Sequence, residues 1–169
     1  HLIRNILMEL GISNVRDAGD AETAFEIFQD FPADLVLTDW SPSLNGMAFL
    51  EKIRQHAESR DMFAPVVMIT AFTEMNQVCK ARDAGINEFL AKPFSAHLIY
   101  SRIKSLIENP RLYVRADSYF GPDRRRRALN YRGRERRGGT PMELPTPRGR
   151  AATTLNASEP KPGSNPLYN

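Results

Sequence analysis

The stretch "LVLTDW", Leu35–Trp40, decides the fold because it joins an apolar run to a carboxylate. Leu35, Val36 and Leu37 are typical of a strand in a parallel sheet, where both faces are buried. Asp39 follows at the point where such a strand emerges from the core. Because ligands of open parallel sheets bind beyond the carboxyl ends of the strands, we expect Asp39 to lie at a reactive edge.

The segments on both sides of this stretch alternate between helical and strand patterns. Apolar residues recur at helical spacing within Leu2–Leu10, Ala21–Phe28, Phe49–Ala57, Met75–Cys79 and Ile99–Ile107. Helix N-caps are expected at Asp20, Thr73 and Ser95. Strands are expected at "NVRDAG" (14–19), "DLVLTD" (34–39), "PVVMIT" (65–70) and "NEFLA" (87–91). This alternation predicts an α/β fold, a doubly wound parallel sheet with helices on both faces.

Charge and composition divide the chain into two parts. Residues 1–110 contain 10 Lys/Arg and 15 Asp/Glu, whereas residues 111–169 contain 13 Lys/Arg and 5 Asp/Glu. Leu, Ile, Val and Phe account for 7 of the last 59 residues, too few for a core of their own. We therefore predict a folded domain over residues 1–109 and a largely disordered, basic, Pro/Gly/Arg-rich tail over residues 110–169.

The single cysteine, Cys79, excludes an internal disulfide and favours a reducing, cytoplasmic setting. No apolar run approaches the roughly 20 residues that a membrane span needs. The tail repeats a Y-x-G-x-acid-R-R pattern at Tyr119–Arg125 and Tyr131–Arg137. Its arginine runs are compatible with a solvated tail, with docking on a partner, or with contacts to a nucleic acid or another polyanion.

Two further side chains are predicted to meet Asp39 at the edge of the sheet. Thr70 closes "PVVMIT", and Lys92 follows "NEFLA" and precedes Pro93. An aspartate can act as a nucleophile towards a phosphoryl group. A lysine ammonium provides a charge for phosphate oxygens, and a hydroxyl provides a hydrogen bond.

These residues and their spacing resemble the receiver domain of response regulators in two-component signalling, close to the single-domain chemotaxis type. The resemblance rests on "RNILMELG", "DLVLTDWSPSLNGMAFLEKIR", "VVMITAF" and "ARDAGINEFLAKPF", and it extends over roughly residues 1–108. It implies the flavodoxin-like receiver fold and a bacterial phosphoprotein in a phosphorelay. It also implies that phosphorylation changes the affinity of the face formed by the last two helices and the last strand.

The resemblance implies a role for each matching residue. Asp39 corresponds to the phosphoacceptor, which becomes an aspartyl phosphate, and Lys92 corresponds to the lysine that contacts the phosphoryl group. Thr70 corresponds to the switch hydroxyl. Phe89 falls at the aromatic switch position, where its ring has no hydroxyl to form a hydrogen bond. Asp39 and the backbone carbonyl of Ser41 correspond to ligands of Mg²⁺.

One part of the family pattern is absent from the sequence. Receivers hold Mg²⁺ with an acidic pair at the end of their first strand, and this chain has neither that strand nor that pair. Asp17 and Asp20 follow the first helix and are not substitutes. We expect that roughly 15–20 residues precede His1 in the natural protein, enough for a strand, a loop and part of a helix. The alternative is a degenerate receiver that never had this strand. The present chain alone is expected to be a poor phosphoacceptor.

The sequence thus predicts a response regulator that receives a phosphoryl group on Asp39 from a sensor histidine kinase or a histidine phosphotransfer protein. It is expected to signal through a change in protein–protein interaction and not to be an enzyme, apart from self-directed phosphotransfer and dephosphorylation. Two alternatives remain: a nucleic-acid or polyanion binding protein acting through Arg124–Arg137, and an interaction module that is never phosphorylated.

Overall fold

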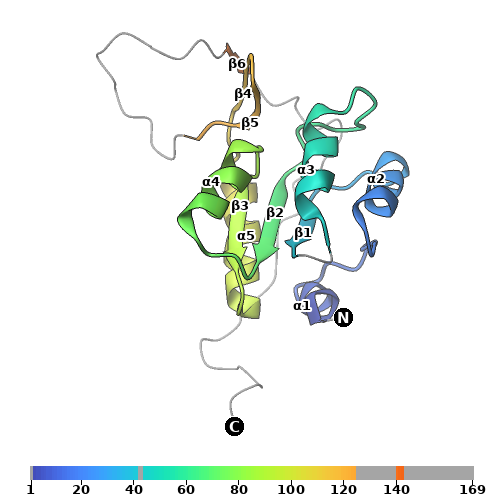
Figure 1. The fold of residues 1–169 in the computed structure, drawn as a ribbon. Helices are drawn as coiled ribbons and strands as arrows, with labels where there is room; N and C mark the ends of the chain where they lie inside the picture. The colour runs from blue at the N-terminus through green and yellow to red at the C-terminus, as the bar shows by residue number, and fades with distance from the viewer. Residues whose placement is uncertain (1, 42–43, 125–139, 143–169) are drawn as a thin grey trace.

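The computed structural model describes residues 2–41, 44–124 and 140–142, and it contains one parallel sheet and one antiparallel sheet (Figure 1). The helices are α1 (Leu2–Glu9), α2 (Ala21–Asp30), α3 (Gly46–Gln55), α4 (Met75–Asp83) and α5 (Ala96–Glu108). The parallel strands are β1 (Val36–Trp40), β2 (Val66–Thr70) and β3 (Glu88–Ala91). The antiparallel strands are β4 (Tyr113–Ala116), β5 (Tyr119–Pro122) and β6 (Thr140–Met142).

The parallel sheet has the order β1-β2-β3, with β2 in the centre. All five residues of β2 are buried, and alternate residues point to opposite faces. Val66 and Met68 pack in a core with α2, α3 and α4, whereas Val67 and Ile69 pack in a second core with α1 and α5. The predicted α/β class, with a parallel sheet covered on both faces, is confirmed.

The helix ends follow local hydrogen bonds, and two of the three predicted N-caps are confirmed. The Asp20 carboxylate accepts a bond of 2.9 Å from the backbone N–H of Thr23, and the Ser95 hydroxyl accepts one of 3.3 Å from that of Leu98. The prediction for Thr73 is wrong, because α4 begins one residue later, with Glu74 at the N-cap position. Glu74 forms no side-chain capping bond.

The strand predicted at residues 14–19 is also wrong. This segment has no strand structure, and Val15 donates a local bond of 3.0 Å to the carbonyl of Ser13. A strand needs hydrogen bonds from a neighbouring strand, and none of the described residues offers one at this edge of the sheet. Tertiary pairing, not the local sequence pattern, decides this segment.

Within the tail that was predicted to be largely disordered, residues 113–122 form a β-hairpin that packs on the domain. Strands β4 and β5 pair from Tyr113 with Pro122 to Ala116 with Tyr119. Tyr113 is only 1% exposed, and its ring packs edge-on against Phe63 at a centroid distance of 5.2 Å. Apart from β6, which pairs with β4, the rest of the predicted tail lies outside the described residues.

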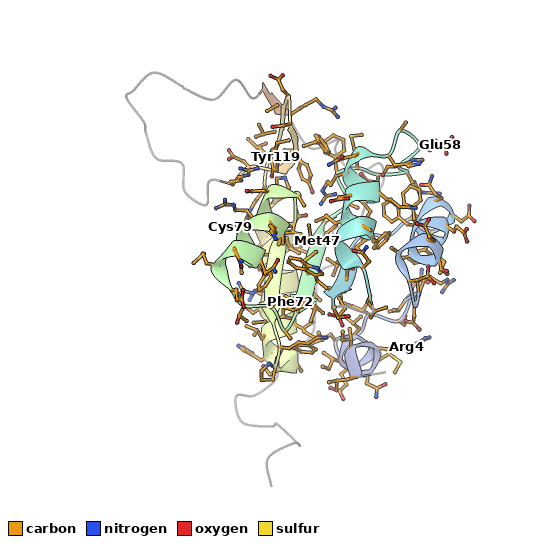
Figure 2. The ribbon with its side chains drawn as sticks, in the orientation of Figure 1. Arg4, Met47, Glu58, Phe72, Cys79 and Tyr119 are labelled. Atoms are coloured by element: carbon orange, nitrogen blue, oxygen red, sulfur yellow. The ribbon has the colours of Figure 1, made fainter. Side chains whose placement is uncertain are left out.

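The hairpin lies at the opposite end of the parallel sheet from the carboxyl ends of its strands (Figure 1). Figure 2 shows Tyr119 of the hairpin at one end of the sheet and Phe72, which follows β2, at the other. Phe63 and Asn87, which contact Tyr113, come just before β2 and β3. The parallel sheet therefore has the carboxyl ends of its strands at one end and the docked hairpin at the other.

Candidate functional site

Asp39 lies in β1 at the carboxyl end of the sheet. Its Oδ2 atom accepts a hydrogen bond of 2.7 Å from the Nζ atom of Lys92, which follows β3. The two side chains are 24% and 38% exposed, so the ion pair is open to solvent and to a reaction partner. Asp39 and Lys92 therefore lie in direct contact, as the sequence predicted.

Lys92 is positioned by the backbone of the neighbouring strand. Its N–H donates a bond of 2.8 Å to the carbonyl of Thr70, which extends the β2–β3 pairing by one residue. The peptide bond between Lys92 and Pro93 is cis. The ammonium group thus crosses from the end of β3, past β2, to reach Asp39 in β1.

Thr70 lies at the end of β2, in register with Trp40, and is completely buried. Its hydroxyl donates a hydrogen bond of 2.9 Å to the carbonyl of Trp40 and accepts one of 2.9 Å from the N–H of Phe72. The Trp40 and Phe72 rings also meet edge-on, at a centroid distance of 5.6 Å. The hydroxyl is therefore bonded to backbone groups beside Asp39.

Gly46 allows the start of α3 to approach the backbone of β1. A Cβ atom at this position would lie 2.4 Å from the Asp39 carbonyl oxygen and 2.7 Å from the Thr38 hydroxyl. Any side chain would therefore push the helix away from the strand that carries Asp39. The N-cap Asn45, whose side chain accepts a bond of 3.2 Å from Ala48, starts the helix at this close contact.

Two oxygen atoms of the described residues are of the kind that Mg²⁺ binds. Asp39 Oδ1 is buried and has no hydrogen-bond partner among the described residues, so it suits a cation. The Ser41 carbonyl oxygen accepts a hydrogen bond of 3.2 Å from the N–H of Leu44. It is the second oxygen atom available as a metal ligand. Across residues 2–41, 44–124 and 140–142, no three His, Cys, Asp or Glu side chains are grouped to hold a metal. These oxygen ligands are of the type that Mg²⁺ prefers, but they are too few to hold the ion by themselves.

The two acids that follow α1 have other interactions. Asp17 forms an ion pair of 2.8 Å with Arg4, and Asp20 caps α2. The bonds from Thr23 lower the pKa of the Asp20 carboxyl below its usual value, the backbone bond having the larger effect. Both carboxylates therefore already have partners, in Arg4 and Thr23 respectively.

Phe89 lies in β3 and is half-buried. Its ring packs at the edge of the core formed with α2, α3 and α4. The neighbouring Glu88 is 6% exposed and forms an ion pair of 2.9 Å with Arg111, at the start of the hairpin segment. Phe89, predicted to be the aromatic switch, is thus next in sequence to a residue that binds Arg111, just before the hairpin.

Sequence reasoning missed the anchor of the hairpin, which is Arg54 of α3. Arg54 is 1% exposed and lies under the Tyr113 ring, with its guanidinium carbon 5.3 Å from the ring centroid. It donates to the carbonyls of Met62, Ala64 and Gly85 and to the Asn87 side chain, at 2.8–2.9 Å. The first copy of the tyrosine–glycine repeat was the signal that could have indicated an ordered segment.

Only the first residue of the Arg124–Arg137 run considered for polyanion binding is described. Arg124 forms an ion pair of 3.2 Å with Asp83, and its guanidinium covers the Tyr119 ring at 4.1 Å. Residues 125–137 lie outside the described part of the chain. In the described part, no helix is both long enough and apolar enough to cross a membrane.

Comparison with known proteins agrees with this geometry. The family described as "Response regulator receiver domain" matches residues 1–104, and the chain belongs to this family. It is 33% identical over 108 residues to the chemotaxis protein CheY of Pseudomonas aeruginosa, covering 63% of this chain and 86% of that protein. The same identity over the same length is found with the chemotaxis protein CheY-3 of Vibrio cholerae, of which 82% is covered. The chain is thus a receiver of the CheY-like type.

Two solved structures have the same fold. Chemotaxis protein CheY4 of Vibrio cholerae aligns with a TM-score of 0.54 at 22% identity, over 61% of this chain and 84% of that one. The receiver domain of a sensor histidine kinase from Pseudomonas aeruginosa aligns with a TM-score of 0.51 at 28% identity, over 62% and 83%. That structure holds a magnesium ion in its active-site cleft.

Proposed function

We propose that this protein is a phosphoacceptor response regulator in which Asp39 receives a phosphoryl group from a phosphohistidine of a sensor kinase or phosphotransfer protein. The observation that carries the proposal is the 2.7 Å ion pair between Asp39 and Lys92 at the carboxyl end of the sheet. An Asp39 oxygen attacks phosphorus, and the phosphorus–nitrogen bond breaks as the donor imidazole leaves. The product is an aspartyl phosphate.

Lys92 and Thr70 have separate roles in this step. The Lys92 ammonium offsets the negative charge of the phosphoryl oxygens, because its Nζ atom already lies beside the Asp39 carboxylate. The Thr70 hydroxyl exchanges its bond to the Trp40 carbonyl for a bond to a phosphoryl oxygen. Phe89 responds as the aromatic switch, and the face of α4, β3 and α5 changes its affinity for a downstream protein.

Mg²⁺ is the cofactor we propose, held by Asp39 and the Ser41 carbonyl together with ligands that the described residues do not include. When bound, the ion would neutralise phosphoryl charge. We also place the protein in the cytoplasm, as expected for the partner of a kinase that uses ATP. We propose no enzymatic activity beyond its own phosphorylation and dephosphorylation.

The experiment measures the initial rate at which the natural gene product takes up labelled phosphoryl groups from an autophosphorylated histidine kinase domain with Mg²⁺. Asp39→Asn abolishes uptake, because the amide has no nucleophilic oxygen, and Lys92→Ala lowers the rate at least tenfold, because the phosphoryl charge loses its partner. The matched control is Asp30→Asn, at the exposed end of α2, which keeps the wild-type rate. Equal uptake by Asp39→Asn would refute the assignment.

A further inference from the structure

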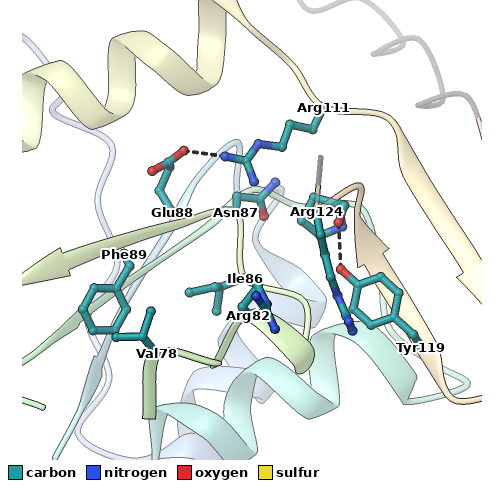
Figure 3. A pocket seen from close by; sticks show the side chains of 10 residues that line it. Val78, Arg82, Ile86, Asn87, Glu88, Phe89, Arg111, Tyr119 and Arg124 are labelled. Atoms are coloured by element: carbon teal, nitrogen blue, oxygen red, sulfur yellow. Dashed lines mark hydrogen bonds and ion pairs between the residues drawn. The ribbon is translucent and has the colours of Figure 1, made fainter. Parts of the chain in front are cut away.

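A pocket of about 110 Å³ lies between α4, β3 and the hairpin (Figure 3). Its apolar lining comes from Val78, Ile86 and Phe89. Its charged lining comes from Arg82 of α4, from Arg111 and Arg124, which flank the hairpin, and from one acid, the buried Glu88 of β3. The receiver family matches residues 1–104, so the hairpin side of this pocket lies outside the family domain.

The arginines around the pocket outnumber the acids that they bind. Arg82 and Arg124 share a single oxygen of Asp83, at 3.0 and 3.2 Å. Arg111 and Arg102 share the buried Glu88, at 2.9 and 3.6 Å. Each of these two groups therefore carries a net charge of +1.

The guanidinium groups can bind a further anion without losing these contacts. A guanidinium has five N–H donors, and each of these ion pairs uses only part of that set. The Arg82 and Arg124 side chains are 52% and 35% exposed. An incoming carboxylate therefore finds donors that are partly desolvated and preorganised by Asp83 and by the Tyr119 ring.

The pocket size and lining indicate one apolar side chain next to the carboxylates. A cavity of about 150 Å³ accommodates benzene, so a pocket of this size suits an aliphatic side chain. The Tyr119 ring, which could stack on a nucleobase, is covered by Arg124 at 4.1 Å. The undescribed residues 125–139 and 143–169 contain 10 Lys/Arg and 3 Glu. Their net positive charge disfavours this part of the chain itself as the occupant of a pocket lined by arginines.

We propose that the pocket between α4, β3 and the hairpin binds an acidic peptide segment of a partner protein, with one aliphatic side chain of that segment against Val78, Ile86 and Phe89. Phe89, which we propose as the aromatic switch, itself lines the pocket. Any dependence of peptide binding on phosphorylation rests on the proposed function, whereas binding itself does not.

The test uses fluorescence polarisation with a fluorescein-labelled Asp-Glu-Leu-Asp-Glu peptide and the unphosphorylated full chain. We expect saturable binding that weakens roughly tenfold in Arg82→Gln, which loses one charge-assisted contact. Arg82 contacts only its neighbour Asp83 among the ion pairs of the described residues, so this variant keeps the hairpin in place. The matched control, Arg4→Gln on α1, removes another exposed arginine and keeps wild-type affinity.

Two further probes identify what the pocket recognises. A peptide with Ser in place of Leu binds at least fivefold more weakly if the apolar lining is used. A short oligothymidylate does not compete with the Leu peptide. Absence of peptide binding, equal effects of Arg82→Gln and Arg4→Gln, or oligothymidylate competition with no preference for Leu would each overturn the proposal. Phosphoryl uptake on Asp39 is measured separately, so either proposal can fail without the other.

Discussion

Arg54 brings a positive charge into the interior beneath the hairpin, where it is 1% exposed. Burial lowers the pKa of its guanidinium below the usual value, and hydrogen bonds to three backbone carbonyls and to Asn87 compensate for the lost water. The residue therefore joins α3, the segments before β2 and β3, and the hairpin through Tyr113. A buried charge with several acceptors is costly to replace.

Replacement of Arg54 by Met is expected to lower the free energy of unfolding by about 3 kcal/mol or more, because the buried acceptors lose their donor. The control Arg60→Met removes an exposed arginine that donates to the Gln29 carbonyl, and its effect is expected to stay within about 0.5 kcal/mol. Urea unfolding followed by far-ultraviolet circular dichroism measures both variants. Equal small effects would show that Arg54 does not anchor the hairpin.

Tyr113 makes stability depend on alkaline pH. Burial raises the pKa of its phenol above the usual value of 10.0. The folded state therefore holds the proton more tightly than the unfolded state, and this contribution is complete below pH 10 and declines as the pH rises above it. The wild type should lose more unfolding free energy between pH 8 and pH 11 than Tyr113→Phe does.

The same urea titrations at the two pH values test this expectation. Tyr113→Phe loses the hydroxyl bonds to Phe63 and Asn87, so it is less stable at pH 8, and the difference from the wild type shrinks at pH 11. A constant difference in unfolding free energy between the two proteins would show that ionisation of Tyr113 is not linked to unfolding.

At the scale of elements, the hairpin docks where two glycines meet. A Cβ atom on Gly121 would lie 2.7 Å from the Cα atom of Gly85, and one on Gly85 would lie 2.8 Å from the Phe120 carbonyl oxygen. Gly85 also has a φ of +97°, which side chains rarely adopt. The glycine in the Y-x-G part of the tail pattern is thus explained by this close approach.

Gly121→Ala is expected to cost about 1–3 kcal/mol, because the new methyl group collides with the Gly85 backbone. The control Gly19→Ala places its methyl in open space, and its effect should be near zero or slightly stabilising. Hydrogen exchange distinguishes a local from a global effect. Amides of residues 113–121 lose protection while those of β2 keep it, and unchanged protection in the hairpin would contradict docking through Gly121.

Local sequence patterns correctly predicted those elements whose own residues determine them, through an apolar strand sequence or a capping side chain. The segment "VVMIT", apolar except for Thr70, is the central strand, and Asp20 and Ser95 cap their helices. Residues 14–19 failed because a strand depends on a partner. Ile107, the last residue of the apolar helical pattern Ile99–Ile107, is 55% exposed in the last turn of α5, so this pattern extends beyond the buried face.

The site and the hairpin were predictable to different degrees, for a physical reason. Asp39 and Lys92 meet because the carboxyl ends of parallel strands lie at one edge of the sheet, and the alternation of helices and strands predicts such a sheet. The hairpin depends on a few aromatic side chains and on Arg54, which a composition average over 59 residues conceals. The hydrogen-bonding state of Thr70 could be known only from coordinates.

At the scale of the whole molecule, the parallel sheet connects two ends with separate chemistry. Asp39, Thr70 and Lys92 occupy the carboxyl ends of the strands, and the hairpin covers the opposite end (Figure 1). Strand β3 links the two, because Lys92 follows its last residue and Glu88 at its start binds Arg111. Phe89 of β3 thus lies between Lys92, which binds Asp39, and the Glu88–Arg111 ion pair beside the pocket.

The most direct test of the central claim locates the phosphoryl group. The natural gene product is incubated with an autophosphorylated histidine kinase domain and Mg²⁺, the product is digested, and the modified peptide is sequenced by mass spectrometry. The account predicts one phosphoryl group, on the peptide containing Asp39, and none in Asp39→Asn. A phosphoryl group on any other residue of the wild type, or none at all, would contradict it.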